Sequence, residues 1–194
     1  MRRLARLPRF FAAKGINPQK LIVTGIPNFD NCAQFSHNDF PYRGYVLVAT
    51  SDARETFKRD DRAAFIRQAL VIANGRFPIF KLHPNENKQR AIDEIRALAP
   101  RALVLTQGDI GPLIANCDVL ITQYSTVVYI GLALGKEVHS YFDVNLLRRL
   151  APSQNGGLSG RNIATVCRSL IETQPLAEPL AKPATQLQGG YVYD

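Results

Sequence analysis

The sequence has little of what cross-linked, metal-binding or membrane-spanning proteins need. Its three cysteines, Cys32, Cys117 and Cys167, form no CxxC pair, which argues against a disulfide framework or a zinc site and fits a reducing cytosol. We expect all three to be small buried apolar side chains. No apolar run approaches the roughly 18 residues of a membrane span. Neither GxGxxG nor GxxxxGK[ST] occurs, so the phosphate loops of NAD-type Rossmann proteins and of P-loop NTPases are absent.

The composition is that of a folded protein of ordinary size. Hydrophobic residues make up 46% of the 194 residues and charged residues 21%, which excludes a disordered or collagen-like chain. This length suffices for one domain and is too short for two full enzyme domains.

Acidic residues are absent from the first 29 positions, so the positive charge is concentrated at the start. The net charge is +8, of which residues 1–20 carry +6 and the remainder +2. The basic residues of this lead-in are Arg2, Arg3, Arg6, Arg9, Lys14 and Lys20. Because the rest of the chain is nearly neutral, we expect no nucleic-acid binding.

The first 11 residues, MRRLARLPRFF, lack the long apolar stretch and the small-residue cleavage site of a secretory signal. As a basic amphipathic segment, residues 1–20 would allow peripheral contact with anionic lipid. A solvated arm, or a helix joined to something upstream, explains the same residues. We therefore expect a cytoplasmic protein, with peripheral attachment to the inner face of the membrane as a further possibility.

Six short apolar runs alternate with segments of helical period, which predicts parallel strands joined by crossover helices. The runs are Leu21–Thr24, Tyr45–Thr50, Pro78–Leu82, Ala102–Thr106, Asp118–Thr122 and Glu137–Phe142. Several are almost continuously apolar, as expected for strands covered on both faces. The predicted fold class is α/β: an open, doubly wound, mainly parallel sheet in a single Rossmann-like domain.

The segments between these runs carry apolar stripes at helical spacing. The predicted helices cover residues 65–73, 92–98, 110–117, 127–134 and 163–171. Asn74-Gly75 closes the first helix, and Asp109 caps the third. We divide the chain into a basic lead-in and interdomain-type segment (1–42), a Rossmann-like domain (43–174) and a proline-containing tail (175–194).

The first candidate site follows the run Pro78–Leu82. In a doubly wound sheet, ligands bind outside the carboxyl ends of the strands, so residues just after a strand are candidates. Here His83-Pro84 follows at once, and the proline favours an extended backbone at His83. The imidazole would point into the ligand crevice and donate to a phosphate oxygen. Alternatively, His83 caps the helix that begins near Lys88.

The second candidate site follows the run Asp118–Thr122. Gln123, Tyr124, Ser125 and Thr126 come directly before an apolar helix. Two hydroxyls and the free N–H groups of that turn would converge where the helix dipole favours an anion, which predicts a seat for a phosphate or diphosphate. Simple helix capping explains Ser125 but leaves Thr126 without a role.

Together these motifs resemble a known family. The string CDVLITQYSTVVYIGLALGKEVHSYFD, with KLHPNEN upstream and VTGIPNFD near the start, resembles the carboxyl-terminal, donor-binding half of GT-B-fold glycosyltransferases. The nearest resemblance is to the group with the CDP-glycerol glycerophosphotransferases and the bacterial sialyl- and Kdo-type capsule transferases. It covers about residues 16 to 145.

The resemblance implies that His83, Ser125 and Thr126 hold the nucleotide and phosphate of an activated donor, with His83 as the catalytic residue. Ser51, with Asp52, would face the same crevice, although a turn with a helix cap explains that loop equally. The chain departs from the family at Ile130, where members often carry an acid. It also holds only one of the two Rossmann-like halves, so a missing N-terminal half is the expected partner.

We therefore expect binding of a nucleotide-activated sugar or glycerol donor, for glycosyl or glycerophosphate transfer in cell-surface polysaccharide synthesis. No cofactor and no metal are expected, since no carboxylate cluster occurs. The alternative is a non-catalytic nucleotide- or partner-binding module from a truncated or split transferase. A sugar-nucleotide 2-epimerase is a third interpretation, weakened by the few acids near the crevice. We attribute Asp60 and Asp61 to a helix start and Asp30 to a structural role.

Overall fold

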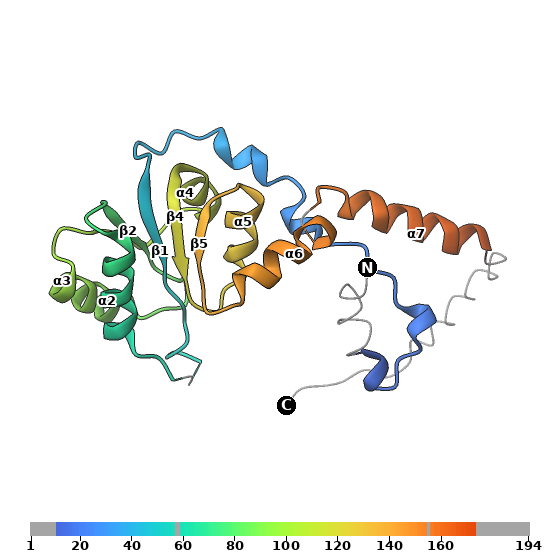
Figure 1. The fold of residues 1–194 in the computed structure, drawn as a ribbon, viewed down its shortest axis with the longest axis horizontal. Helices are drawn as coiled ribbons and strands as arrows, with labels where there is room; N and C mark the ends of the chain where they lie inside the picture. Colours follow the sequence, from blue (N-terminus) through green and yellow to red (C-terminus); the bar gives the residue numbers. More distant parts are fainter. Residues whose placement is uncertain (1–10, 57–58, 155, 174–194) are drawn as a thin grey trace, which may run out of the picture.

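A five-stranded, all-parallel sheet forms the centre of the protein (Figure 1). The computed structural model describes residues 11–56, 59–154 and 156–173. The strands are β1 (Tyr45–Ala49), β2 (Pro78–Lys81), β3 (Leu103–Leu105), β4 (Cys117–Thr122) and β5 (Glu137–His139). Their order is β3-β2-β1-β4-β5, which confirms the predicted doubly wound α/β class.

The sheet is buried on both faces because alternate side chains of its strands enter two separate cores. In β1, Tyr45, Leu47 and Ala49 pack into one core, and Val46 and Val48 into the other. All five are at most 5% exposed. A strand between two cores must be apolar at every position, which is why the run was recognisable in the sequence.

Each core is closed by its own pair of helices. The helices α2 (Arg62–Ala73) and α3 (Lys88–Leu98) cover one face, and α4 (Ile110–Asn116) and α5 (Val127–Ala133) cover the other (Figure 1). Asp109 caps α4, as predicted, by accepting from the Gly111 N–H. Asn74 ends α2 in the left-handed conformation with φ 48°, also as predicted.

The structure corrects three expectations about secondary structure. The run Leu21–Thr24 is not a strand but a connection between two short 3-10 helices, Pro18–Lys20 and Pro27–Phe29. The side chains of Ile22 and Val23 are more than half exposed there. They therefore do not pack into either core, as the side chains of the sheet strands do. Only the first part of the run Glu137–Phe142 is a strand, which ends at His139. The helix α6 (Val144–Gln154) was not predicted, and it contains Pro152.

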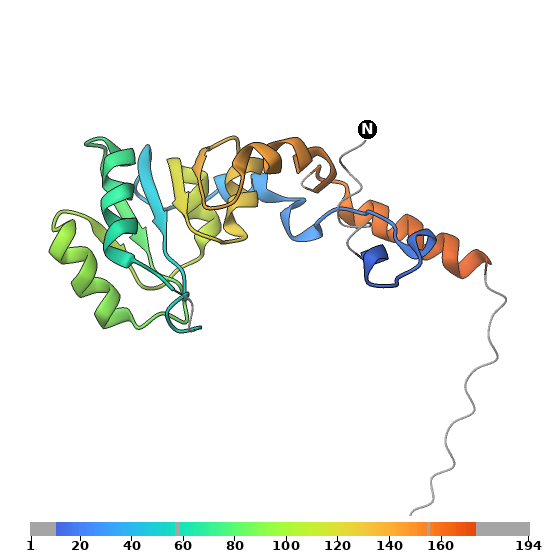
Figure 2. The ribbon, with the colours of Figure 1, turned by 60° about the horizontal axis from the view of Figure 1, so that its bottom comes forward.

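The last helix lies away from the sheet. After α6, the helix α7 (Ser159–Thr173) extends beyond the sheet, and both views place the N-terminal segment beside the α6–α7 region (Figures 1 and 2). The Asn162 amide donates to the Thr24 carbonyl at 3.1 Å, and the Gly160 N–H donates to Asp30 at 2.8 Å. The Gly160 bond lowers the pKa of Asp30. Asp30 thus has the structural role that the sequence suggested.

The cysteines follow the prediction only in part. Cys32 and Cys117 are buried, and burial raises the pKa of the Cys117 thiol to about 12. Cys167 is exposed on α7, so the expectation that all three are buried was wrong. In the part of the chain described, none of the helices has the length and apolarity to cross a membrane. The predicted lipid contact was assigned to residues 1–20, and the first ten of these lie outside the described residues. The predicted tail, residues 175–194, also lies outside them.

Candidate functional site

The strand order reverses between β1 and β4. The chain moves outward from β1 through β2 to β3, and then returns to the other side of β1 as β4. At such a point the loops that follow the two neighbouring strands lead away in opposite directions. This opens a crevice beyond the carboxyl ends of the two strands. The loops that begin at Thr50, at Leu82 and at Gln123 all lie at this edge.

A cavity of about 360 Å³ occupies this edge on the face covered by α4 and α5. His83 and Pro84, which follow β2, line it together with Ser125 and Thr126, which precede α5. The other lining residues are Ala49, Thr50, Lys81, Leu82, Gly108, Asp109, Ile110 and Val127. His83 and Ser125, 42 positions apart in the chain, therefore face one space.

The imidazole of His83 is held so that one nitrogen remains available. The Asn85 N–H donates to Nδ1 of His83 at 3.3 Å, which places the proton of a neutral ring on Nε2. Asp52 Oδ2 lies 3.8 Å from the same Nδ1, and Asn85 also donates to that carboxylate. About a third of the His83 side chain is exposed. Nε2–H thus has no hydrogen-bond partner among the described residues, and it is the ring group available for the phosphate oxygen predicted from the sequence.

The two hydroxyls before α5 play different local roles. The Ser125 hydroxyl accepts from the Val127 N–H at 3.4 Å, which stabilises the turn and leaves the hydroxyl proton free to donate. Thr126 is the N-cap of α5, and its side chain makes no capping bond. Simple capping therefore does not account for Thr126, whose side chain is exposed beside the cavity.

The remaining predicted site residues do not line this cavity. The Ser51 hydroxyl donates to Oε1 of Gln123, whose amide nitrogen in turn donates to Asp60 at 2.6 Å. Ser51 and Gln123 thereby tie the loops after β1 and β4 together. Tyr124 is 69% exposed and packs edge-on against Tyr141 and Phe142.

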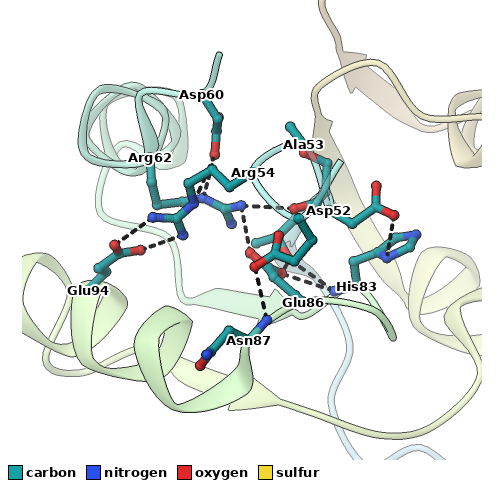
Figure 3. Close-up of polar contacts among 12 residues, drawn as sticks. Asp52, Ala53, Arg54, Asp60, Arg62, His83, Glu86, Asn87 and Glu94 are labelled. Carbon is teal, nitrogen blue, oxygen red and sulfur yellow. Dashed lines mark hydrogen bonds and ion pairs between the residues drawn. The ribbon is translucent and has the colours of Figure 1, made fainter. Parts of the chain in front are cut away.

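A buried ionic cluster supports the loop that carries His83 (Figure 3). The side chain of Glu86 has no exposed surface, and its Oε1 lies 2.6 Å from Nη2 of Arg62. Nε of the same arginine lies 3.2 Å from Oδ2 of Asp60. The other oxygen of Glu86 accepts from the Thr50 hydroxyl and from the His83 N–H. Glu86 thus joins the loops after β1 and β2 to the first turn of α2.

Glu86 and Arg62 were not predicted as functional residues, and the role predicted for Asp60 was wrong. Asp61 does cap α2, but the Asp60 side chain is fully buried among charges rather than placed for the helix dipole. Arg62 lies at the start of a helix, and Glu86 lies three residues after His83. Charged residues at such positions are usually exposed on a protein surface. Nothing in their spacing reveals that they become buried against each other.

A more exposed ion pair lies beside this cluster. Both terminal nitrogens of the Arg54 guanidinium donate hydrogen bonds to the carboxylate oxygens of Glu94, at 2.7 and 2.8 Å. This contact raises the pKa of Arg54 and lowers that of Glu94. Glu55 pairs with Arg90 and accepts from the Asn87 N–H. The Arg54–Glu94 pair (Figure 3) and the Glu55–Arg90 pair both fasten the loop after β1 to α3.

Lys81 is a further functional candidate that the sequence analysis did not single out. It is 7% exposed at the end of β2, lines the cavity, and donates to the Leu82 carbonyl at 3.0 Å. Burial lowers its pKa. A lysine within an otherwise apolar strand was the available signal. Across residues 11–56, 59–154 and 156–173, no group of three or more metal-ligating side chains could hold an ion.

Comparison with known proteins identifies this architecture. No protein-family model and no curated protein sequence matches the chain. Among solved structures, the UDP-GlcNAc 2-epimerase of Methanocaldococcus jannaschii, in complex with UDP-GlcNAc and UDP, matches with a TM-score of 0.60 at 14% identity. The UDP-GlcNAc 2-epimerase of Neisseria meningitidis, bound to UDP-GlcNAc, matches at 0.53 and 17%. The chain has the fold of one half of a GT-B-type enzyme.

The matched region is a large part of this chain and about half of those enzymes. It covers 83% of this chain and 58% of the M. jannaschii enzyme, and 86% of this chain and 51% of the N. meningitidis enzyme. The wall teichoic acid polymerase TagF also matches, with a TM-score of 0.39 at 12% identity over 82% of this chain and 47% of that chain.

Proposed function

We propose that residues 43–174 form the donor-binding domain of a GT-B-type transferase, between an interdomain-type segment (1–42) and a tail (175–194). The donor is a nucleotide-activated sugar or glycerol, and the reaction is glycosyl or glycerophosphate transfer in cell-surface polysaccharide synthesis. The observation that carries the proposal is the shared cavity. His83, Ser125 and Thr126 meet there at the crossover edge of the sheet.

The groups around the cavity suit a phosphate. Nε2 of His83 and the hydroxyls of Ser125 and Thr126 are hydrogen-bond donors, and Lys81 adds a cation at the cavity wall. In the proposed transfer, an acceptor hydroxyl attacks the activated group and loses its proton to water, while the bond to the nucleotide phosphate breaks and the nucleotide leaves as an anion. These donors would stabilise the negative charge that develops on the leaving phosphate. His83 is the proposed catalytic residue because its Nε2–H can donate a hydrogen bond to the phosphate oxygen on which that charge develops.

Nucleotide binding tests the proposal directly. We expect the full chain to bind CDP, CMP or UDP in isothermal titration calorimetry. We expect Ser125→Ala and His83→Gln each to weaken binding about 10- to 100-fold, because a hydrogen bond to a charged group contributes about 1.5–3 kcal/mol. Tyr124→Ala is the matched control, since that side chain is exposed and does not line the cavity. Binding that survives both cavity substitutions would contradict the proposed site.

A second candidate function is sugar-nucleotide 2-epimerisation. The fold match to two 2-epimerases supports it, as do the carboxylate of Asp52 near His83 and that of Asp109 at the cavity. Asp109, however, accepts from the Gly111 N–H as a helix cap. We expect no conversion of UDP-GlcNAc by this chain in a product analysis by chromatography. Formation of UDP-ManNAc would replace the transferase proposal, whereas no binding of any nucleotide would favour the non-catalytic module.

A further inference from the structure

Among the described residues, Asp52 supplies the carboxylate that lies against the ring of His83 (Figure 3). Its Oδ2 lies 3.8 Å from Nδ1 of the imidazole. Asp52 belongs to the loop after β1 and His83 to the loop after β2, and these two strands are parallel neighbours, with Ala49 paired to Lys81. The carboxylate and the ring therefore meet because both loops leave the same edge of the sheet.

No arginine neutralises Asp52 in the part of the chain that the structure describes. The arginines of the surrounding cluster pair with other carboxylates: Arg54 with Glu94, Arg62 with Glu86 and Asp60, and Arg90 with Glu55. The Asp52 carboxylate accepts a hydrogen bond from the Asn85 side-chain amide at 3.3 Å. Its negative charge is therefore available to the imidazole.

The neutral form of His83 leaves two acceptors facing each other. In that form Nδ1 carries a lone pair, which accepts the Asn85 N–H at 3.3 Å and also faces the Asp52 oxygen. If the ring takes up a proton at Nδ1, that nitrogen becomes a donor to Asp52, while Nε2–H is still available to a ligand. The contact with Asp52 is thus a hydrogen bond only for the protonated ring.

The other charged groups around the ring decide when it takes up that proton. Lys81 lines the same cavity, and its ammonium opposes a second positive charge there. Asp109 also lines the cavity, although it serves as the cap of α4. Glu86 accepts the His83 N–H, but its carboxylate is paired with Arg62. A bound phosphate would neutralise Lys81 and add a negative charge beside Nε2, which favours the imidazolium in the complex.

We propose that Asp52 is a positioning residue that holds His83 as an imidazolium while the phosphate of the donor is bound. The inference rests on the proposed donor-binding function. The proton enters from solvent at Nδ1 when the donor binds and returns to solvent when the nucleotide leaves, so the balance of the transfer reaction is unchanged. A hydrogen bond donated by a charged group is about twice as strong as a neutral one. The cationic ring therefore stabilises the leaving phosphate more than a neutral imidazole does.

Calorimetry of the full chain with UDP-GlcNAc and CDP-glycerol counts this proton. Both phosphates of these probes are esterified, so the probes themselves do not titrate near neutral pH. At about pH 7.5, where a free histidine is mostly neutral, the binding enthalpy is measured in buffers of different ionisation enthalpy. We expect uptake of about one proton by the unsubstituted chain and almost none by Asp52→Asn. Because binding takes up a proton, the affinity of the unsubstituted chain should fall with rising pH, by up to about tenfold per pH unit.

Glu55→Gln is the matched control for Asp52→Asn. Glu55 is a carboxylate of the same loop that pairs with Arg90 and not with His83. We expect this variant to keep the proton uptake and the pH dependence of affinity. A general loosening of the loop is thereby separated from the effect of Asp52.

Nitrogen NMR of the imidazole rings gives a second readout. The chain has three histidines, so the ring signals that disappear in His83→Gln identify His83. We expect both ring nitrogens of His83 to carry a proton in the complex with the donor probe. In the complex of Asp52→Asn, we expect only one of them to carry a proton.

The outcomes separate this inference from the proposed function. A donor complex that forms without proton uptake refutes the role of Asp52 and leaves the donor site in place. Proton uptake that persists in Asp52→Asn refutes that role as well. If neither probe binds to the unsubstituted chain, the donor site itself fails.

Discussion

Glu86→Gln is expected to lower the free energy of unfolding by about 3–5 kcal/mol, because it removes one partner of a fully buried ion pair. Arg62 is 3% exposed and would keep its ion pair with Asp60 while losing the one with Glu86. Glutamine retains the shape of the side chain and one acceptor for the His83 N–H. The loss is therefore mainly electrostatic, and urea denaturation measures it.

Glu94→Gln is the matched control for this substitution. Glu94 also pairs with an arginine, Arg54, but its side chain is 34% exposed, so water already screens the pair. We expect a loss of about 0–1 kcal/mol. Equal effects of the two substitutions would show that burial of Glu86 does not stabilise the loop that carries His83. We also expect Glu86→Gln to weaken nucleotide binding, since that loop lines the cavity.

Gly131→Val is expected to destabilise the protein by about 1–3 kcal/mol through overpacking. A Cβ atom at Gly131 would lie 2.8 Å from Cδ2 of Leu120 and 2.9 Å from Cγ2 of Val138. Both neighbours are buried in the sheet, and Val138 is stiff at χ1. Valine has a better helix propensity than glycine by only a few tenths of a kcal/mol, so the clash outweighs it.

This substitution should also affect the candidate site, because α5 follows Ser125 and Thr126 directly. Moving α5 away from β4 would displace both hydroxyls, and we expect nucleotide affinity to fall about tenfold, which corresponds to about 1.4 kcal/mol. Ala133→Val on the exposed side of α5 is the control, with an expected loss of about 0.5 kcal/mol from helix propensity alone. Unchanged nucleotide binding in Gly131→Val would contradict the placement of the site on this helix.

Local sequence signals predicted much of the candidate site. His83 and Pro84 directly follow a buried apolar run, and Ser125 and Thr126 follow another, so topology alone places them at one edge of a parallel sheet. Gln123 and Ser51 were predicted to bind substrate as well. In the structure their side chains bond to each other between two loops, an arrangement that depends on residues 72 positions apart. Glu86 and Arg62 were not predicted for the same reason, because their contact also joins segments that are distant in the sequence.

The sequence by itself determined the fold class. The central strands are almost continuously apolar, and the crossover helices carry apolar stripes at helical spacing. Both patterns can be recognised from neighbouring residues in the sequence. The sequence also predicted which strand ends border the candidate site. Only the tertiary structure decided that a carboxylate and a guanidinium bury each other beneath His83, and that Leu21–Thr24 stays outside the sheet. It likewise decided that the carboxylate of Asp52 lies beside the ring of His83. Burial and pairing of side chains depend on contacts between distant segments, which no local pattern contains.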